Sequence, residues 1–225
     1  MVRPAACLFD LDGLLLDTEP LHAEAWQQAS SHFGLRLQSD ELMALRGRRR
    51  LDCADQVRQW IAAAGYDAPS LEELLAVRQP IAEALLVQAQ PMPGAKALVE
   101  RCHDLGVPMA LATSSSRSAV ALKAEPHPWI ALIKERVHGD DPDLKRGKPE
   151  PDVFELAAER LGVLCRDSWA FEDSPAGATA AIAAGCQVLV MPPSDLQPAE
   201  RMRRYPEGIW QFLSDLTAVL PLLEQ

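Results

Sequence analysis

The chain has 225 residues, of which 48% are hydrophobic and 24% charged, and its formal net charge is −10. Such a chain can form a large domain or a domain with an insertion, and its composition is that of a globular protein. The negative charge disfavours general binding to nucleic acids or to anionic membranes. We expect no membrane helix, because no apolar run reaches ~18 residues, and no signal peptide.

Cysteine usage indicates the compartment. The five cysteines are scattered along the chain, and no Cys-x-x-Cys pair occurs. We therefore expect free thiols in a reducing cytosol, a cytoplasmic location and no zinc site.

The first predicted element is a short apolar strand over residues 4–10. A block of helices follows, because apolar residues then recur at helical spacing. These helices are expected at residues 20–33, 39–46, 50–64 and 70–88. The Pro- and Gly-containing segment 90–94 breaks the helical pattern.

From residue 94 onward, predicted helices and strands alternate. The strands are expected at 107–112, 133–137, 168–172 and 186–191. The helices are expected at 94–105, from about Ser116, and at 151–161, 175–184 and 210–222. Such alternation predicts an α/β fold with a doubly wound, Rossmann-like parallel sheet. Residues 1–16 and 92–225 would form this core, and residues 17–91 would be an inserted helical domain.

Two aspartates, Asp10 and Asp12, end the first predicted strand and are followed by Gly13. Alternate side chains of a strand point to the same side, so both carboxylates can leave the strand end together. Carboxylates this close repel each other, so a cation must hold one ionised or one must keep its proton. Either arrangement suits a metal-bound nucleophile beside a general acid. Alone, the pair would be typical of a turn.

Polar residues also follow the later predicted strands, and sites in open parallel sheets lie beyond the carboxyl ends of strands. The second strand leads into Thr113 and Ser114, the third is followed by a loop with Lys148, and the fourth ends in Glu172 and Asp173. Each feature is ordinary by itself, as a helix cap, a solvated lysine or acids near a helix start. Together they predict one site.

The chain resembles the haloacid dehalogenase-like phosphohydrolases in four stretches. They are Phe-Asp10-Leu-Asp12-Gly, Leu-Ala-Thr113-Ser114-Ser, Gly-Lys148-Pro and Phe-Glu172-Asp173-Ser. The resemblance covers essentially the whole chain and points to the branch (subfamily I) with a helical cap inserted after the first strand. Shorter stretches are similar to pseudouridine-5′-phosphatase-like members, and fewer of them are shared with β-phosphoglucomutase-like members. Residues 17–91 would then be the cap.

The resemblance implies hydrolysis in two steps. Asp10 would attack phosphorus and become an aspartyl phosphate. Asp12 would protonate the leaving alcohol and later deprotonate the water that breaks the intermediate. Thr113 and the backbone amide of Ser114 would hold the phosphoryl oxygens, and Lys148 would neutralise the nucleophile and the phosphate.

The implied cofactor is Mg²⁺, which prefers oxygen ligands. Asp10, the backbone carbonyl of Asp12 and Asp173 would supply the protein ligands, and Glu172 would bind directly or through water. Without Mg²⁺ and Lys148, the carboxylates and a phosphate ester would repel each other.

Residues of the cap are expected to meet the substrate. Arginines stand at positions 46, 48, 49 and 50, and by resemblance Arg50 would contact the substrate. A solvated cap face is the alternative. His22 matches a histidine that serves proton transfer in β-phosphoglucomutase, and an exposed helix start is its alternative. The substrate would be a small phosphorylated metabolite, such as pseudouridine 5′-phosphate, a nucleotide or a sugar phosphate, and the enzyme a monomer.

Three other functions stay open. A β-phosphoglucomutase-like phosphomutase would also use His22 and Arg50, but the mutase has a cap lysine where Gln79 stands here. A dehalogenase would need neither magnesium nor Asp12. A non-catalytic scaffold would be expected to lack at least one residue of the four motifs, and none is lacking.

Overall fold

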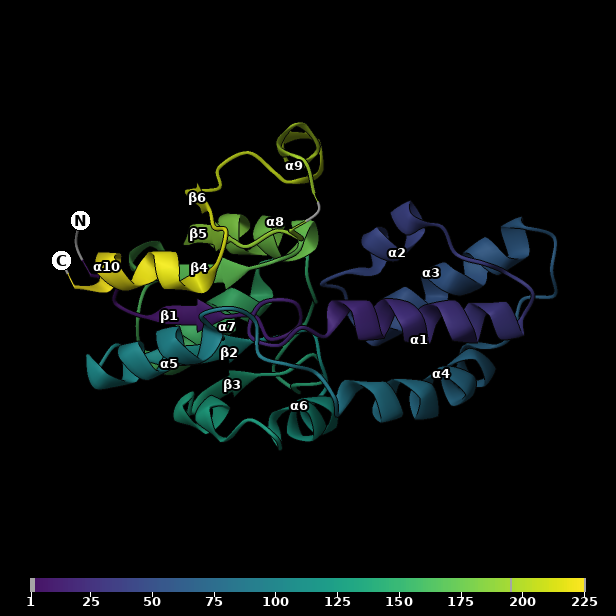
Figure 1. Ribbon diagram of the computed structural model, residues 1–225, viewed down its shortest axis with the longest axis horizontal. Coiled ribbons are helices and arrows are strands. Elements are labelled where there is room, and N and C mark those ends of the chain that lie inside the picture. The colour runs from purple at the N-terminus through teal and green to yellow at the C-terminus, as the bar shows by residue number, and fades with distance from the viewer. Residues whose placement is uncertain (1–2, 195, 225) are drawn as a thin grey trace.

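The computed structural model of the protein describes residues 3–194 and 196–224. Its centre is a six-stranded sheet with the strand order β3-β2-β1-β4-β5-β6 (Figure 1). The strands are β1 (Cys7–Phe9), β2 (Met109–Ala112), β3 (Glu135–Val137), β4 (Trp169–Glu172), β5 (Gln187–Val190) and β6 (Gln211–Phe212). Every neighbouring pair is parallel. The predicted α/β fold with a doubly wound parallel sheet is confirmed.

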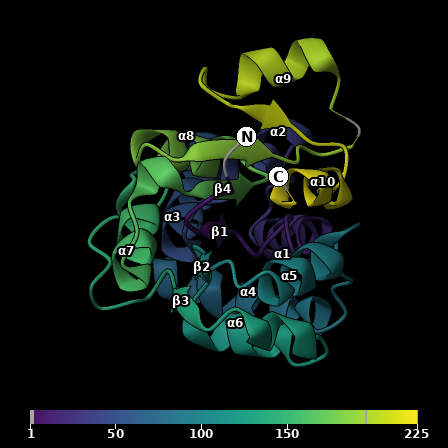
Figure 2. The same cartoon turned by 90° about the vertical axis from the view of Figure 1, so that its left-hand side faces the viewer.

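Helices cover both faces of the sheet. Cys7 and Phe9 pack against α5 (Ala95–Asp104) on one face, whereas Leu8 packs against α7 (Asp152–Leu161) and α8 (Pro175–Ala183) on the other. Figure 2 shows α7 and α8 on one side, and α5 and α10 (Leu220–Leu223) on the other. Burial on both faces explains why the first strand is a continuous apolar run instead of an alternating one.

Four helices between β1 and α5 form a separate unit, here called the helical block. They are α1 (Glu19–His32), α2 (Ser39–Leu45), α3 (Arg50–Ala63) and α4 (Leu71–Leu86). The block has an apolar core of its own, to which Trp26, Val57 and Leu74 contribute from three helices. α4 begins with a capping box, in which Ser70 and Glu73 each accept the backbone N–H of the other. In Figure 1 the helical block lies beyond the carboxyl ends of the strands.

Two adjacent connections join the helical block to the sheet. Leu16 pairs with Pro91 in an antiparallel bridge. Met92 donates its backbone N–H to the carbonyl of Leu15 (3.0 Å). The chain therefore leaves the core and returns to it along neighbouring paths.

The predicted helix over residues 210–222 is wrong in its first half. Residues Gln211–Phe212 form β6, and backbone N–H groups on either side of it donate to β5. Helical structure begins only after Asp215, which accepts the N–H of Thr217 (2.7 Å) at the start of the turn η3 (Leu216–Val219). Sheet hydrogen bonds therefore override the helical spacing of the apolar residues.

Four further helical elements complete the fold. The stretch predicted from about Ser116 is α6 (Arg117–Ala124), whereas α9 (Pro198–Arg204) and the turns η1 (Pro128–Leu132) and η2 (Cys165–Asp167) were not predicted. The five cysteines are free thiols. Across the described residues, no helix has the length and apolarity needed to cross a membrane.

Candidate active site

The carboxyl ends of three neighbouring strands bring the predicted acidic and hydroxyl residues together. Because β1 lies between β2 and β4, Asp10 meets Thr113 on one side and the Glu172–Asp173 pair on the other. All four side chains are buried. Asp10, Glu172 and Asp173 each offer a carboxylate oxygen, and these oxygens lie within 4.8 Å of one another.

Lys148 links two of these carboxylates. Its ammonium group lies 2.6 Å from Asp10 Oδ1 and 2.5 Å from Glu172 Oε1. Burial alone would lower the pKa of Lys148, but the two carboxylates raise it above its usual value, so the lysine is charged. Burial outweighs the attraction of Lys148 at Asp10 and raises the pKa of Asp10 to about 8. The pKa of Asp10 therefore indicates that one lysine is not enough to balance the negative charge here.

The donor set fits a magnesium ion. Asp173 Oδ1 is buried and has no hydrogen-bond partner among the described residues. Glu172 is already engaged at both oxygens, because Oε1 accepts from Lys148 and Oε2 accepts from the amide of Asp173 (3.1 Å) and the hydroxyl of Ser174 (3.2 Å). Hard oxygen atoms at this spacing suit Mg²⁺, with Asp10 and Asp173 better placed to bind it than Glu172.

Charge counting agrees with that fit. Three groups of ion pairs hold the carboxylates of the site: Lys148 binds Asp10 and Glu172, Arg46 binds Glu19 and Asp173, and Lys123 binds Asp12. Counted over these three groups of described residues, five carboxylates face three cations, which leaves two negative charges without a cation of their own. A divalent ion would balance them. Burial, opposed by Arg46, also raises the pKa of Asp173 well above its usual value, as expected for a carboxylate with too little positive charge nearby.

Glycine at position 13 lets the loop after β1 pass close to this cluster. Gly13 has a φ of +80°, and a Cβ atom there would lie 2.3 Å from Asp173 Oδ2. A side chain would therefore be both strained and in collision with a carboxylate of the cluster.

Asp12 faces a second buried lysine. Lys123, on α6, places its ammonium group 2.5 and 2.6 Å from the two carboxylate oxygens of Asp12. The hydroxyls of Thr18 and Ser115 donate to Asp12 Oδ1 and Oδ2, each at 2.7 Å. Burial alone would raise the pKa of Asp12, but Lys123 and His22 lower it well below its usual value. The crowding of the two aspartates is thus relieved by a separate lysine for each.

His22 lies between the helical block and the core. Its Nε2 is 3.2 Å from Asp12 Oδ1, and its Nδ1 is 3.0 Å from Arg78 Nη2. Because arginine can only donate, we assign the ring proton to Nε2, which then donates to Asp12. Arg78 is buried and stacks over the ring of Trp26, 4.1 Å from its centroid. The predicted substrate contact of His22 is therefore, in this arrangement, a contact with Asp12.

The residues after β2 also contact the helical block. Ser114 donates its hydroxyl to the carbonyl of Gly47 (2.8 Å), and Thr113 Oγ1 accepts the amide of Ser115 (3.1 Å). Thr113 and Ser114 both line the central cavity. Thr113 and Ser114 therefore lie at the end of β2, beside Asp10. Ser114 also joins the core to the helical block through its hydrogen bond to Gly47.

The arginine run is divided among different partners. Arg46 contacts Glu19 and Asp173, each at 3.0 Å, and so joins the helical block to the acidic cluster. Arg50 is exposed and donates to Gln79 Oε1 (2.7 Å). Arg49 has two buried nitrogens with no partner among the described residues. The run is therefore more than a solvated face.

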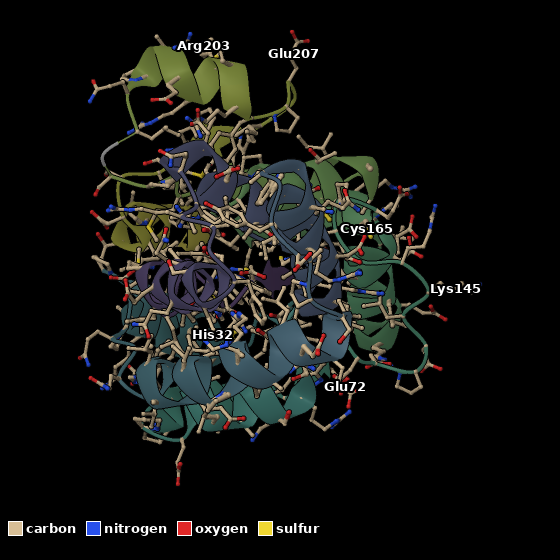
Figure 3. All side chains as sticks on the ribbon, turned by 90° about the vertical axis from the view of Figure 1, so that its right-hand side faces the viewer. His32, Glu72, Lys145, Cys165, Arg203 and Glu207 are labelled. Carbon is tan, nitrogen blue, oxygen red and sulfur yellow. The ribbon has the colours of Figure 1, made fainter. Side chains whose placement is uncertain are left out.

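A cavity of about 1040 Å³ lies between the strand ends and the helical block. Asp10, Asp12 and Thr113 line it from the core, and the arginines at positions 46, 48, 49 and 50 line it from the block. Figure 3 looks from the side of the block, whose purple-to-blue helices lie in front of the sheet. The labelled His32 and Glu72 are exposed on the block. A cavity of this size suits a small molecule.

Three residues at the site were not predicted in these positions: Lys123, Arg46 and Tyr205, whose hydroxyl donates to the carbonyl of Asp173. A signal for Lys123 was present in the sequence. It stands three residues after Val120, so the two share one helix face, and both are buried. A lysine on the buried face of a helix indicates a buried partner.

The fold and the site together define a hydrolase with a Rossmann-like core. A family model of the haloacid dehalogenase-like hydrolases matches residues 4–185. The chain belongs to the haloacid dehalogenase-like hydrolases, as its four motifs predict.

Sequence similarity to curated relatives covers most of the chain. The Arabidopsis thaliana protein (DL)-glycerol-3-phosphatase 1, mitochondrial, is 33% identical over an alignment of 194 residues that covers 84% of this chain and 64% of that protein. This chain therefore spans slightly less than two thirds of that relative's length. The Drosophila melanogaster protein named "Probable pseudouridine-5'-phosphatase" is 38% identical over 191 residues, 83% of this chain and 80% of that protein.

Solved structures share the fold. The crystal structure of CbbY from Rhodobacter sphaeroides in complex with phosphate has a TM-score of 0.79 to this chain. It covers 99% of this chain and 100% of its own at 22% identity, which supports the fold alone.

Proposed function

We propose that this protein is a Mg²⁺-dependent phosphatase that hydrolyses a small phosphorylated metabolite through an aspartyl phosphate on Asp10. The placement of Asp10 carries the proposal. Its carboxylate follows the central strand, is bound by Lys148 at 2.6 Å, and lies beside Glu172 and Asp173 at the wall of a cavity. Phosphatase relatives and the family match support the same reaction class.

The first step forms the aspartyl phosphate. A carboxylate oxygen of Asp10 attacks phosphorus, and the bond from phosphorus to the ester oxygen breaks. Because its pKa is lowered, Asp12 is a carboxylate in the arrangement described above, so it must first take up a proton from water. It then gives this proton to the departing alkoxide, which leaves as an alcohol. Thr113 and the amide of Ser114 hold the phosphoryl oxygens, and Lys148 offsets the charge that Asp10 and the phosphoryl group share.

The second step regenerates the enzyme. Asp12, now a carboxylate, takes a proton from a water molecule as the water oxygen attacks phosphorus. The bond from phosphorus to the Asp10 oxygen breaks, and inorganic phosphate leaves. The helical block keeps other water away from the intermediate.

We propose that Asp10, Asp173 and the backbone carbonyl of Asp12 hold Mg²⁺, with Glu172 holding Lys148 and reaching the ion through water. When bound, Mg²⁺ reduces the repulsion between the carboxylates and the phosphoryl group. Two observations support this assignment: Asp173 Oδ1 has no hydrogen-bond partner among the described residues, and the ion pairs of the site leave two negative charges without a cation.

We propose that residues 17–91 act as a cap over a catalytic core of residues 1–16 and 92–225. The adjacent connections at Leu16 and Pro91 and the contact between Ser114 and Gly47 support this division. Arg50 and His22 would then reach the substrate from the cap, His22 after leaving Asp12. Two further predictions stand with the proposal: a monomer, which light scattering tests, and a cytoplasmic location, which cell fractionation tests.

A phosphate-release screen would identify the substrate. It would test pseudouridine 5′-phosphate, nucleotides, glycerol 3-phosphate and sugar phosphates in the presence of Mg²⁺. Release of phosphate from at least one alkyl ester, and its loss in Asp10→Asn, would support the proposal. An Asp10→Asn variant that keeps its turnover would reject Asp10 as the nucleophile.

A phosphomutase is the second candidate, because His22 lies against Asp12 as proton transfer would require. Gln79 weighs against it, since it binds Arg50 and brings no charge of its own. Incubation with β-glucose 1-phosphate and a bisphosphate primer separates the two functions. Formation of glucose 6-phosphate without release of free phosphate would reject the phosphatase proposal in favour of the mutase.

A further inference from the structure

Lys123 is a buried lysine for which the proposed phosphatase reaction assigns no role. It is 1% exposed, and its side chain is fully enclosed on α6. Burying a lysine costs free energy unless it is paired, and buried ion pairs stabilise a fold poorly compared with apolar packing. A buried lysine against the proposed general acid therefore calls for an explanation beyond stability.

The hydrogen bonds of Lys123 leave it no donor for a substrate. An ammonium group has three N–H donors. Lys123 uses them on Asp12 Oδ1 (2.5 Å), Asp12 Oδ2 (2.6 Å) and Ser115 Oγ (2.8 Å). Neither Lys123 nor Ser115 is among the residues that line the cavity. Lys123 can therefore act on the reaction only through Asp12.

The position of Lys123 connects the general acid to the phosphate-holding segment. α6 begins two residues after Ser115, and Ser115 follows directly on Thr113 and Ser114. Ser115 accepts from Lys123 and donates to Asp12 Oδ2 (2.7 Å). One continuous stretch of chain thus holds both the phosphoryl-binding residues and the lysine that orients Asp12. A general acid must lie within hydrogen-bond reach of the ester oxygen, so this connection sets its geometry.

We propose that Lys123 is a positioning residue for proton delivery to the leaving group, an inference that rests on the phosphatase reaction proposed above. It fixes both oxygens of Asp12 relative to the bound phosphoryl group.

The leaving group provides the test, because an alkoxide needs the proton and a p-nitrophenolate scarcely does. The alkyl substrate is the fastest of glycerol 3-phosphate, pseudouridine 5′-phosphate and fructose 1-phosphate, and the aryl substrate is p-nitrophenyl phosphate. Bond cleavage is followed in single turnovers with Mg²⁺, which separates it from hydrolysis of the aspartyl phosphate. Lys123→Met is expected to slow alkyl ester cleavage ~10²–10³-fold and p-nitrophenol release less than ~10-fold.

The controls separate positioning from folding and from the reaction itself. Lys96→Met, at an exposed lysine of α5, should change neither rate. Equal losses for both esters in Lys123→Met would overturn the role of Lys123 while leaving the phosphatase proposal intact. A wild-type enzyme that cleaves no ester would overturn both proposals.

A second variant covers the case in which Lys123→Met does not fold. The double variant Asp12→Asn/Lys123→Met carries no unpaired carboxylate at this position and is compared with Asp12→Asn. If Lys123 acts only through Asp12, the two should cleave each ester at rates within about 3-fold of each other. A further loss of 10-fold or more in the double variant would overturn the proposal.

Discussion

At the strand ends, the two aspartates of the first motif contact two different buried lysines. Lys148 binds Asp10, and Lys123 binds Asp12, at distances of 2.5–2.6 Å. Both cations come from the core, where Lys148 also binds Glu172 and Lys123 also donates to Ser115. Both aspartates therefore contact a fixed cation before a substrate arrives, although two negative charges of the site still lack one.

In the helical block, by contrast, the arginines of positions 46–50 are paired unevenly. Arg46 reaches across to the acidic cluster, Arg50 stays within the block on Gln79, and Arg49 keeps two buried nitrogens unpartnered among the described residues. The difference suggests two separate roles: the lysines of the core would neutralise the reacting groups, and the arginines of the block would bind the substrate. We refer to this as the division between block and core. The predictions below test that division.

The largest effect is expected for Asp10→Asn. The amide cannot form an aspartyl phosphate, so phosphatase activity should fall by at least ~10⁴-fold. Asparagine has nearly the same shape, so the circular dichroism spectrum should not change. Phosphate release is the measurement, and Asp104→Asn at the exposed end of α5 is the control.

Removing Mg²⁺ should have the next largest effect. Chelation by EDTA should lower turnover at least ~10²-fold, and added Mg²⁺ should restore it, because the acidic cluster is short of two positive charges. Asp173→Asn should raise the Mg²⁺ concentration needed for half-maximal activity. A rate that is insensitive to the chelator would contradict the metal assignment.

Arg46→Met should change metal binding in the opposite direction. The positive charge of Arg46 lies beside Asp173 and would repel a cation bound there. Removal of the arginine should therefore tighten Mg²⁺ binding about 3–10-fold. Isothermal titration calorimetry with Mg²⁺ alone measures this without substrate. Arg36→Met, an exposed arginine of the block, is the matched control. Weaker binding in Arg46→Met would mean that the arginine supports the cluster instead of competing with the ion.

Arg50→Met should separate binding from chemistry. If the block only binds ligand, KM should rise about 3–10-fold while kcat stays within about 2-fold. Steady-state kinetics on the best substrate of the screen measures both, with Arg58→Met as the control within the same helix. A fall in kcat alone would place the arginine in the chemical step and break the division between block and core.

The smallest effect is expected for an ion pair of the core outside the site. Arg160 hydrogen-bonds Asp141 at 2.7 and 2.9 Å, which holds the pKa of Asp141 below its usual value. The pair therefore stabilises the fold above about pH 4, and this contribution is lost as the pH falls through the lowered pKa. Asp141→Asn should lower the free energy of unfolding by about 1–2 kcal/mol at pH 7, and by less at pH 3.5. Urea unfolding measures this, and kcat should not change.

The parts of the fold that could be predicted are those with local signals. The helices of the block follow from apolar spacing and from caps such as Ser70 with Glu73, which involve residues three or four apart. The order of the four motifs at strand ends was sufficient to predict which residues meet. The segment around β6 failed because its hydrogen bonds go to β5, and short apolar runs do not reveal such a partner.

The roles of Lys123 and Arg46 at the site could not be predicted, because their partners are distant in the sequence. Lys123 is 111 residues from Asp12, and Arg46 is 127 residues from Asp173. No local pattern relates such residues, and a lysine or arginine without its partner resembles a solvated one. The sequence predicted the carboxylates and Lys148, and only the folded chain shows how their charges are divided.

The paired connections at Leu16 and Pro91 have a mechanical consequence. Because the two connections are hydrogen-bonded to each other, we expect any movement of the block relative to the core to be a hinge motion at this point. Opening at this hinge would break the contacts between the block and the core, among them Arg46 with Asp173, His22 with Asp12, and Ser114 with Gly47. Such an opening would therefore change the contacts of the acidic cluster and of Asp12, the proposed general acid, in the same movement that admits the substrate.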